Sequence, residues 1–427
     1  MLKLFILGVF LGYKLQKTLN FMGKYKLTWR DLSWNDFKVY LFALFKMNLL
    51  KKSPYYVVFG AAVTVFITLG LNHSNGLFLL PITNELNSGR ELFSLAGAFG
   101  ILFSGIGAPF FGGLSDKYGA GRTIFILGLL QIISWIWVGN INSEFDLFGS
   151  RILMGIGQSG VLGIALSITG RSINSKNKSV FLGVIMASGS FGQFVMVPII
   201  NYFINNFGWV YSSILASVLI SPLLIMSILI SKNSSSQDFI ENDQTIYESL
   251  KNAINNRSYK LLTAGFFVCG FHVTFVSTHL PAFLSDNNLE ESLAGFALAL
   301  IGLFNIFGTL SFGYLGSKIS KKNLLSTLYS LRSLLFLSFI IAPKNEFTVL
   351  VFSATLGILW LSTVPLTNGI ITDIFGHKYS SMLFGFTLMS HHIGSFLGSW
   401  LGGRIFDLYG SYAPVWWLCV ILGFTSA

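Results

Sequence analysis

Continuous apolar runs of about 20 residues recur along the chain from residue 54 onward, and they constrain its fold more than any other feature. Each run is long enough to cross a membrane, because an α-helix rises about 1.5 Å per residue and the hydrocarbon core is about 30 Å thick. Only 11% of the residues are charged, whereas a soluble domain carries about 25%. The runs do not alternate with polar residues as barrel strands do. The sequence therefore predicts an all-α membrane protein.

Twelve membrane spans are predicted, six on each side of a polar linker. Their expected limits are 54–83, 92–115, 122–140, 145–170, 178–203 and 208–231, followed by 259–286, 293–317, 323–342, 347–373, 381–406 and 412–427. The last span has roughly 16 residues before Ala427, which reach ~24 Å as a helix. We therefore expect a final helix that is short or truncated.

Three changes of composition divide the chain into domains. The Ser- and Asn-rich segment 232–258 is predicted to be a cytoplasmic linker between two six-helix bundles, 54–231 and 259–427. Residues 1–53 form a separate basic extension, in which residues 1–52 carry ten Lys and Arg against two acidic residues. Apolar residues between Trp34 and Leu49 recur close to helical spacing, which suits a helix lying on an anionic leaflet. A dispensable extension, or a true start at Met47, explains the segment equally well.

The basic residues predict the orientation. With a cytoplasmic N-terminus, the inner segments contain fifteen Lys or Arg: Lys51, Lys52, Lys117, Arg122, Arg171, Lys176, Lys178, Lys232, Lys251, Arg257, Lys260, Lys318, Lys321, Lys322 and Lys378. The outer segments and their helix ends contain only Arg90, Arg151, Lys344 and Arg404. This asymmetry follows the positive-inside rule. We therefore expect a multi-pass protein of the cell (plasma or inner) membrane with its N-terminus in the cytoplasm.

A short charged turn lies between the second and third predicted spans and contains Gly112, Asp116, Lys117, Gly119 and Arg122. A weaker copy begins 201 residues later at Gly313, with Ser317 in place of the acidic residue. The repetition predicts two related halves, a layout common among carriers. Asp116 can pair with Arg122 or with a neighbouring helix end in one conformation only, which would bias an inward–outward equilibrium. We expect the gate in the second half to be weaker.

The turn resembles the loop between helices 2 and 3 of the major facilitator superfamily, Gly-x-x-x-Asp-Arg/Lys-x-Gly-x-Arg-Arg/Lys, with Gly121 replacing one basic residue. Four stretches, beginning at Gly76, Gly189, Gly270 and Ser390, resemble its monocarboxylate-carrier and oxalate/formate-antiporter branch. The resemblance implies two pseudo-symmetric six-helix bundles and a small organic anion as substrate. It also implies that the first, fourth, seventh and tenth helices line the cavity. Relatives often have an arginine where this chain has Asn72, which makes a polar or neutral substrate more plausible.

Polar residues inside spans are costly in lipid, so they are the candidates for substrate binding or ion coupling. The candidates are Asn72, His73, Asn75, Gln158, Gln193, His272, His279, Asn368 and His391. For each of them, hydrogen bonding between helices is the competing interpretation. Histidine suits proton coupling because it titrates near neutral pH. His391 and the adjacent His392 cannot share a helix face, so at most one of them is expected to face the cavity. No metal site is expected from the histidines or from Cys269 and Cys419.

Arg151 and Arg332 are the candidate anion contacts, with a snorkelling side chain and a structural anchor as the respective alternatives. Asp373 is a further charged position and is expected to pair with Lys378. No ATP-binding loop, catalytic triad or cofactor motif is recognisable in the sequence. We therefore expect a secondary transporter, not an enzyme, that moves a monocarboxylate-like anion by symport or antiport. Its partners would be the substrate, the bilayer and a proton or counter-anion, with no nucleic acid. Efflux of a drug-like or neutral solute is the alternative.

Overall fold

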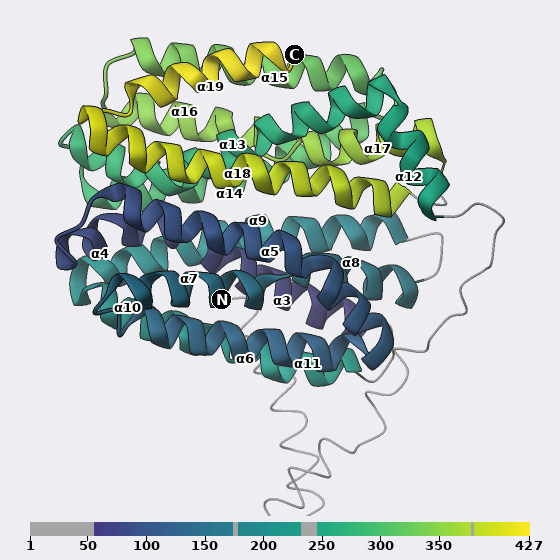
Figure 1. The fold of residues 1–427 in the computed structure, drawn as a ribbon, viewed down its shortest axis with the longest axis horizontal. Coiled ribbons are helices and arrows are strands. Elements are labelled where there is room, and N and C mark those ends of the chain that lie inside the picture. The colour runs from purple at the N-terminus through teal and green to yellow at the C-terminus, as the bar shows by residue number, and fades with distance from the viewer. Residues whose placement is uncertain (1–54, 174–177, 232–245, 377–379) are drawn as a thin grey trace, which may run out of the picture. The chain divides into compact units, whose positions relative to one another are not determined.

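The computed structural model describes residues 55–173, 178–231, 246–376 and 380–427. The chain divides into two units, 1–53 and 54–427. The expected N-terminal extension and residues 232–245 of the expected linker therefore lie outside the described residues. All regular secondary structure in the described part is helical (Figure 1).

The first six predicted spans are present as helices or broken helices. The first consists of α3 (Tyr55–Asn72), the 3₁₀ turn η2 (Asn75–Phe78) and α4 (Leu79–Glu85). The next four are α5 (Arg90–Tyr118), α6 (Ala120–Val138), the pair α7 (Glu144–Gln158) and α8 (Val161–Ser172), and α9 (Lys178–Phe207). The sixth is α10 (Trp209–Ile220) with α11 (Pro222–Ser231).

The second half follows the same plan after α12 (Ile246–Asn255), a short helix within the expected linker. Its spans are α13 (Arg257–Asp286), α14 (Glu291–Leu315), α15 (Lys321–Ile341), the pair α16 (Glu346–Leu359) and α17 (Thr363–Phe375), α18 (Ser380–Tyr409) and α19 (Ala413–Thr425). By length and composition, ten helices of the described residues can cross a membrane. With α18 and the shorter α19, they account for the twelve predicted spans.

The sequence explains where several helices begin and end. Gly119 has a φ of 97°, a backbone region open to glycine, so α5 stops there and α6 starts at once. Ser143 caps α7 by accepting a hydrogen bond from the Asp146 amide, and Asn345 forms a capping box at the start of α16. These caps satisfy amides that the helix itself leaves unpaired.

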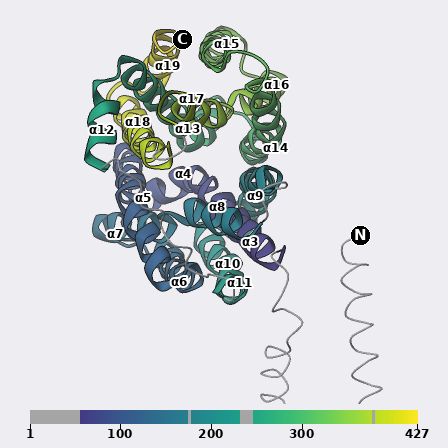
Figure 2. The same ribbon diagram turned by 90° about the vertical axis from the view of Figure 1, so that its right-hand side faces the viewer.

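The helices form two bundles, α3–α11 and α13–α19 (Figure 2). The bundles meet where α5 packs on α18, α9 packs on α14, and η2 and α4 pack on α13. Gly76 allows the closest of these approaches, because a Cβ at this position would lie 2.1 Å from the carbonyl oxygen of Ser277. The fold thus places the break in the first span directly against the second bundle.

Candidate functional site

The first span breaks at a short polar stretch, where α3 ends and η2 begins. The side chain of Asn75 donates hydrogen bonds to the backbone oxygen and to Oδ1 of Asn72, at 2.9 and 3.1 Å. Ser74 is buried, and its hydroxyl lies 3.4 Å from the carbonyl oxygen of Gly70. The polar side chains therefore bind backbone groups that the missing helical turn leaves free.

Arg151 of α7 joins this break to the fourth span. Its side chain is only 3% exposed, its Nη1 donates to Oδ1 of Asn75, and its guanidinium carbon lies 4.6 Å from the centre of the Phe93 ring. The structure excludes the snorkelling alternative, because a snorkelling head group lies in water. Asn72, Asn75 and Arg151, all predicted site residues, form one connected network that we call the Arg151 site.

The Arg151 site carries an uncompensated positive charge. Nε and Nη2 of the guanidinium have no hydrogen-bond partner among the described residues. The four ion pairs of the described residues do not include Arg151. A buried charge is costly unless it is paired, and an arginine does not escape that cost by losing its proton. The site is therefore suited to an anion.

Four other candidate residues are at least partly exposed and take no part in the hydrogen bonds of this network. His73, Gln158 and His391 are partly exposed and Asn368 is exposed. The ring of His391 packs 5.1 Å from the ring of Phe266, between centroids. His73 adjoins the break in the first span and Gln158 adjoins the break in the fourth.

The remaining candidates are buried and bonded to protein. Nε2 of Gln193 donates to the carbonyl oxygen of Leu298 at 2.8 Å, which ties α9 to α14. Nε2 of His272 donates to the carbonyl oxygen of Cys419 at 2.9 Å, and Nε2 of His279 to that of Ser399 at 2.7 Å. In this conformation these three side chains hold helices together, which is the competing interpretation. Arg332 is likewise buried and bonds backbone carbonyls.

Sequence reasoning missed a network of charges at the end of the bundles where α5 begins and α13 ends. Arg90 binds Asp286 through two hydrogen bonds of 2.6 and 2.7 Å and donates to the Tyr412 hydroxyl at 3.0 Å. Asp407 accepts from the backbone amides of Arg90 and Glu91 at 3.0 and 2.7 Å. Each of these contacts joins one bundle to the other, so we call the set the Arg90 gate.

Two further contacts complete the Arg90 gate. Glu91 forms an ion pair of 2.9 Å with Arg404 and accepts a hydrogen bond of 3.0 Å from the indole of Trp400. The sequence does contain a signal for this gate, because acidic residues lie at helix ends on the expected outer side of the membrane. This signal was not used in the sequence-based prediction.

At the opposite end, the charged turn pairs within one bundle. Asp116 forms an ion pair of 2.6 Å with Arg171 of α8, a neighbouring helix end, and not with Arg122. Lys117 lies near its own neighbour, 5.2 Å from the centre of the Tyr118 ring. Gly112 has open space where a Cβ would be. The loop therefore ties α5 to α8 in this conformation.

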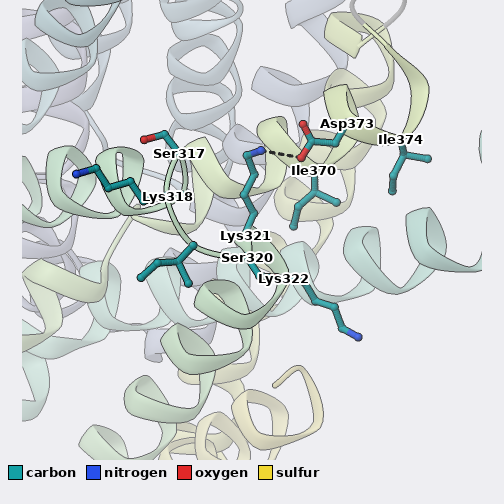
Figure 3. A pocket seen from close by; sticks show the side chains of 10 residues that line it. Ser317, Lys318, Ser320, Lys321, Lys322, Ile370, Asp373 and Ile374 are labelled. Atoms are coloured by element: carbon teal, nitrogen blue, oxygen red, sulfur yellow. Dashed lines mark hydrogen bonds and ion pairs between the residues drawn. The ribbon is translucent and has the colours of Figure 1, made fainter.

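The second half uses different residues at the same end. Lys321 at the start of α15 pairs with Asp373 of α17 at 2.6 Å, beside a shallow cavity of about 430 Å³ (Figure 3). Lys378, the expected partner of Asp373, lies outside the described residues. In this pair the basic residue comes first along the chain and the acidic residue second, which is the reverse of the Asp116–Arg171 pair. The second half thus has an ion pair at this end, although Ser317 stands where the first half has Asp116.

The contacts define one conformational state for the described residues. Hydrogen bonds between bundles include those of Gln193, Asn201, Asn305 and Ser399 as well as the Arg90 gate. They lie at the Arg90 end or near the middle of the helices. At the Asp116 end, the ion pairs join helices of the same bundle. The bundles are therefore held closed at the Arg90 end.

We expect Asp116→Asn to slow transport several-fold while leaving the melting temperature almost unchanged. The ion pair is about half exposed, and exposed pairs contribute only ~0.2–1 kcal/mol to stability. Transport by proteoliposomes and unfolding followed by intrinsic fluorescence would test this. Lys117→Gln is the matched control and should change neither quantity. An Asp116→Arg/Arg171→Asp double variant that fails to recover activity would count against the pairing.

Comparisons with known proteins identify the class. The family model described as Major Facilitator Superfamily matches residues 60–398, and the chain belongs to this superfamily. It is therefore a multi-pass membrane transporter and not an enzyme. In a comparison of folds, the chain matches the crystal structure of a mutant of the nucleoside transporter NupG with a TM-score of 0.70 and 13% identity, covering 87% of this chain and 98% of that one. The predicted two-bundle fold is confirmed.

Curated relatives confirm the predicted resemblance within the superfamily. The chain is 22% identical over 391 residues to the uncharacterized MFS-type transporter YcxA of Bacillus subtilis, covering 88% of this chain and 95% of the relative. It is 21% identical to monocarboxylate transporter 13 of Rattus norvegicus, covering 83% of each chain. It is 20% identical to the oxalate:formate antiporter of Oxalobacter formigenes, covering 85% of this chain and 87% of the relative.

Proposed function

We propose that this chain is a secondary active transporter of a small, monocarboxylate-like organic anion, which it moves by alternating access of a site between the two bundles. The observation that carries the proposal is the Arg151 site, with its buried and uncompensated guanidinium. The relatives named for monocarboxylates and for oxalate and formate support the same substrate class.

The unpaired groups of Arg151 have the geometry that a carboxylate requires. Nε–H and Nη2–H point the same way along one edge of the planar guanidinium, and this edge has no partner among the described residues. A carboxylate can accept both hydrogen bonds side by side. The opposite edge is occupied by Asn75, which fixes the plane of the guanidinium. Protein atoms cover this edge in the present structure, so a carboxylate would bind it in one orientation only after neighbouring side chains move.

The second candidate anion contact, Arg332, lacks this arrangement. Its unpaired groups are Nε and Nη1, which lie on different edges of the guanidinium, while Nη2 is bonded to backbone carbonyls. It also lies on α15, which packs on α16, α17 and α19 of its own bundle. We therefore assign the anion to Arg151 and not to Arg332.

The transport cycle needs a closed state at each end in turn. The Arg90 gate closes one end in the present structure, and we propose that this end faces outward because the basic segments lie at the other. Proton symport and anion exchange both agree with this cycle. His73 and His391, whose side chains are partly exposed, are the candidates for proton coupling.

The experiment that tests the proposal is uptake of radiolabelled formate, lactate, pyruvate and oxalate into proteoliposomes. We expect saturable uptake of at least one acid, stimulated by an inward proton gradient or by preloading with a second anion. The matched control is lactamide, which replaces the carboxylate of lactate by a neutral amide. Equal transport of lactate and lactamide would favour a neutral-solute or drug-like carrier and contradict the proposal.

A further inference from the structure

The break between α16 and α17 is held by side chains that take no part in the Arg151 site. A helix break leaves carbonyl groups free at the end of the first segment and amides free at the start of the second. Arg332 of α15 is fully buried, and its Nη2 donates to the carbonyl oxygens of Leu359 and Trp360, the latter at 2.7 Å. The carbonyl end of the break is therefore capped from α15.

The amide end of the same break is held from the other side. Oδ1 of Asn305 on α14 accepts a hydrogen bond of 3.0 Å from the backbone amide of Leu361. Nδ2 of Asn305 donates to the hydroxyl of Ser190 on α9, in the first bundle, at 2.8 Å. Asn305 is 2% exposed. It therefore links the break in the second bundle directly to the first bundle.

The first half contains a counterpart of the Arg332 cap. The fourth span breaks between α7 and α8, and Nε2 of the buried Gln131 on α6 donates to the carbonyl oxygen of Gly157 at 2.8 Å. Residue numbers 131 and 332 differ by 201, as do 112 and 313 of the repeated turn. Two chemically different side chains at equivalent positions of the two halves thus bond carbonyl groups at the end of a broken helix, and Arg332 reaches one and two residues beyond Ile358, the equivalent of Gly157.

The local sequence explains why the second half uses an arginine. Gly157 brings its backbone so close to α6 that a Cβ would lie 2.8 Å from Cγ of Gln131. The residue 201 positions later is Ile358 and not a glycine. A side chain longer than that of glutamine is therefore needed in the second half to reach the carbonyl groups. A cation is also favoured at the carboxyl end of a helix such as α16, where the backbone dipoles present negative charge.

We propose that Arg332 and Asn305 form a clamp that fixes the angle between α16 and α17, and that Arg332 is a positioning residue for the alternating-access movement. The clamp transmits motion because Asn305 contacts α9 while α17 carries Asp373 and the Lys321 ion pair at its far end. Rocking of one bundle against the other would therefore reach α17 through the break. This role holds whatever the substrate is.

Hydrogen–deuterium exchange of the purified protein tests the clamp without a substrate. Arg332→Met keeps a long side chain but removes the donor, and we expect the amides within 361–367, where only Pro365 has no amide hydrogen, to exchange about tenfold faster. Arg332→Lys keeps a donor and should restore slow exchange in most part. Gln131→Met is the matched variant in the first half, and it should accelerate exchange of residues 159–165 while leaving 361–367 unchanged.

The outcomes separate the clamp from general packing. A global loss of stability in Arg332→Met would speed exchange in all helices to a similar degree, and with no selective effect on 361–367 the clamp would be disproved. If Arg332→Met does not fold, Asn305→Leu provides the same readout at the amide end. In proteoliposomes, Arg332→Met should lower the maximal rate at which an acid is transported and leave unchanged the acid concentration that gives half of this rate. An increase in that concentration would make Arg332 a substrate contact instead.

Discussion

Replacing Arg151 with methionine is expected to reduce the uptake of carboxylates at subsaturating substrate by about thirtyfold or more. The reason is that the anion would lose a bidentate, charge-assisted contact in a buried site, and losses of one partner of such contacts amount to ~2–5 kcal/mol. The measurement is the initial rate of uptake of a transported acid into proteoliposomes, corrected for the amount of reconstituted protein.

Two controls make this prediction specific. Arg151→Lys keeps the charge but offers no side-by-side pair of N–H groups, so we expect an intermediate loss of about tenfold. The melting temperature of Arg151→Met should not fall, because the substitution removes an unpaired buried charge. Normal carboxylate transport by Arg151→Met, or a loss explained by unfolding, would contradict the assignment of the Arg151 site.

The fold could be predicted from the sequence because the physics that fixes it is carried by long segments. A run of about 20 apolar residues has few stable states in a bilayer other than a helix, since each backbone polar group needs a partner within its own segment. The charged turn and its copy 201 residues later indicated two related halves. None of these inferences depends on the neighbour of any single side chain.

The breaks in the helices were harder to predict. The stretch from Asn72 to Gly76 is polar enough to suggest a local break, and the structure shows one there. The break from Trp360 to Ser362 has no glycine or proline among its residues, although Pro365 follows closely. It depends on Arg332 and Asn305, which come from other helices, so no sequence pattern within the span predicts the break.

The candidate site was predicted only in part for a related reason. Asn72, Asn75 and Arg151 come together because the first span breaks beside the fourth. Gln193, His272 and His279 were equally good candidates for the site, because they are also polar residues within spans. Their partners are backbone carbonyls of other helices. A sequence shows which side chains need a partner in lipid, while only the packing shows whether protein or substrate supplies it.

Loss of Asp286 is expected to open the Arg90 end of the transporter. In Asp286→Asn the guanidinium of Arg90 would lose its bidentate partner in the other bundle, and the equilibrium should shift about tenfold toward opening at this end. The measurement is the labelling rate of Ser399→Cys by a charged maleimide, with Cys269 and Cys419 replaced by serine. Ser399 is 1% exposed and its hydroxyl donates to the carbonyl oxygen of Ser94 across the bundle interface, so its labelling requires separation of the bundles.

The matched control is Asp146→Asn. Asp146 is also acidic and lies at the same end, but its partners Ser143 and Trp137 belong to its own bundle. Its substitution should leave the labelling of Cys at position 399 unchanged. Faster labelling in Asp286→Asn alone would show that the charge pair between bundles holds this end closed. Equal labelling in both variants would mean instead that the close packing of α18 on α5, where a Cβ at Gly403 would lie 2.6 Å from the carbonyl oxygen of Arg90, keeps this end closed without help from the charges.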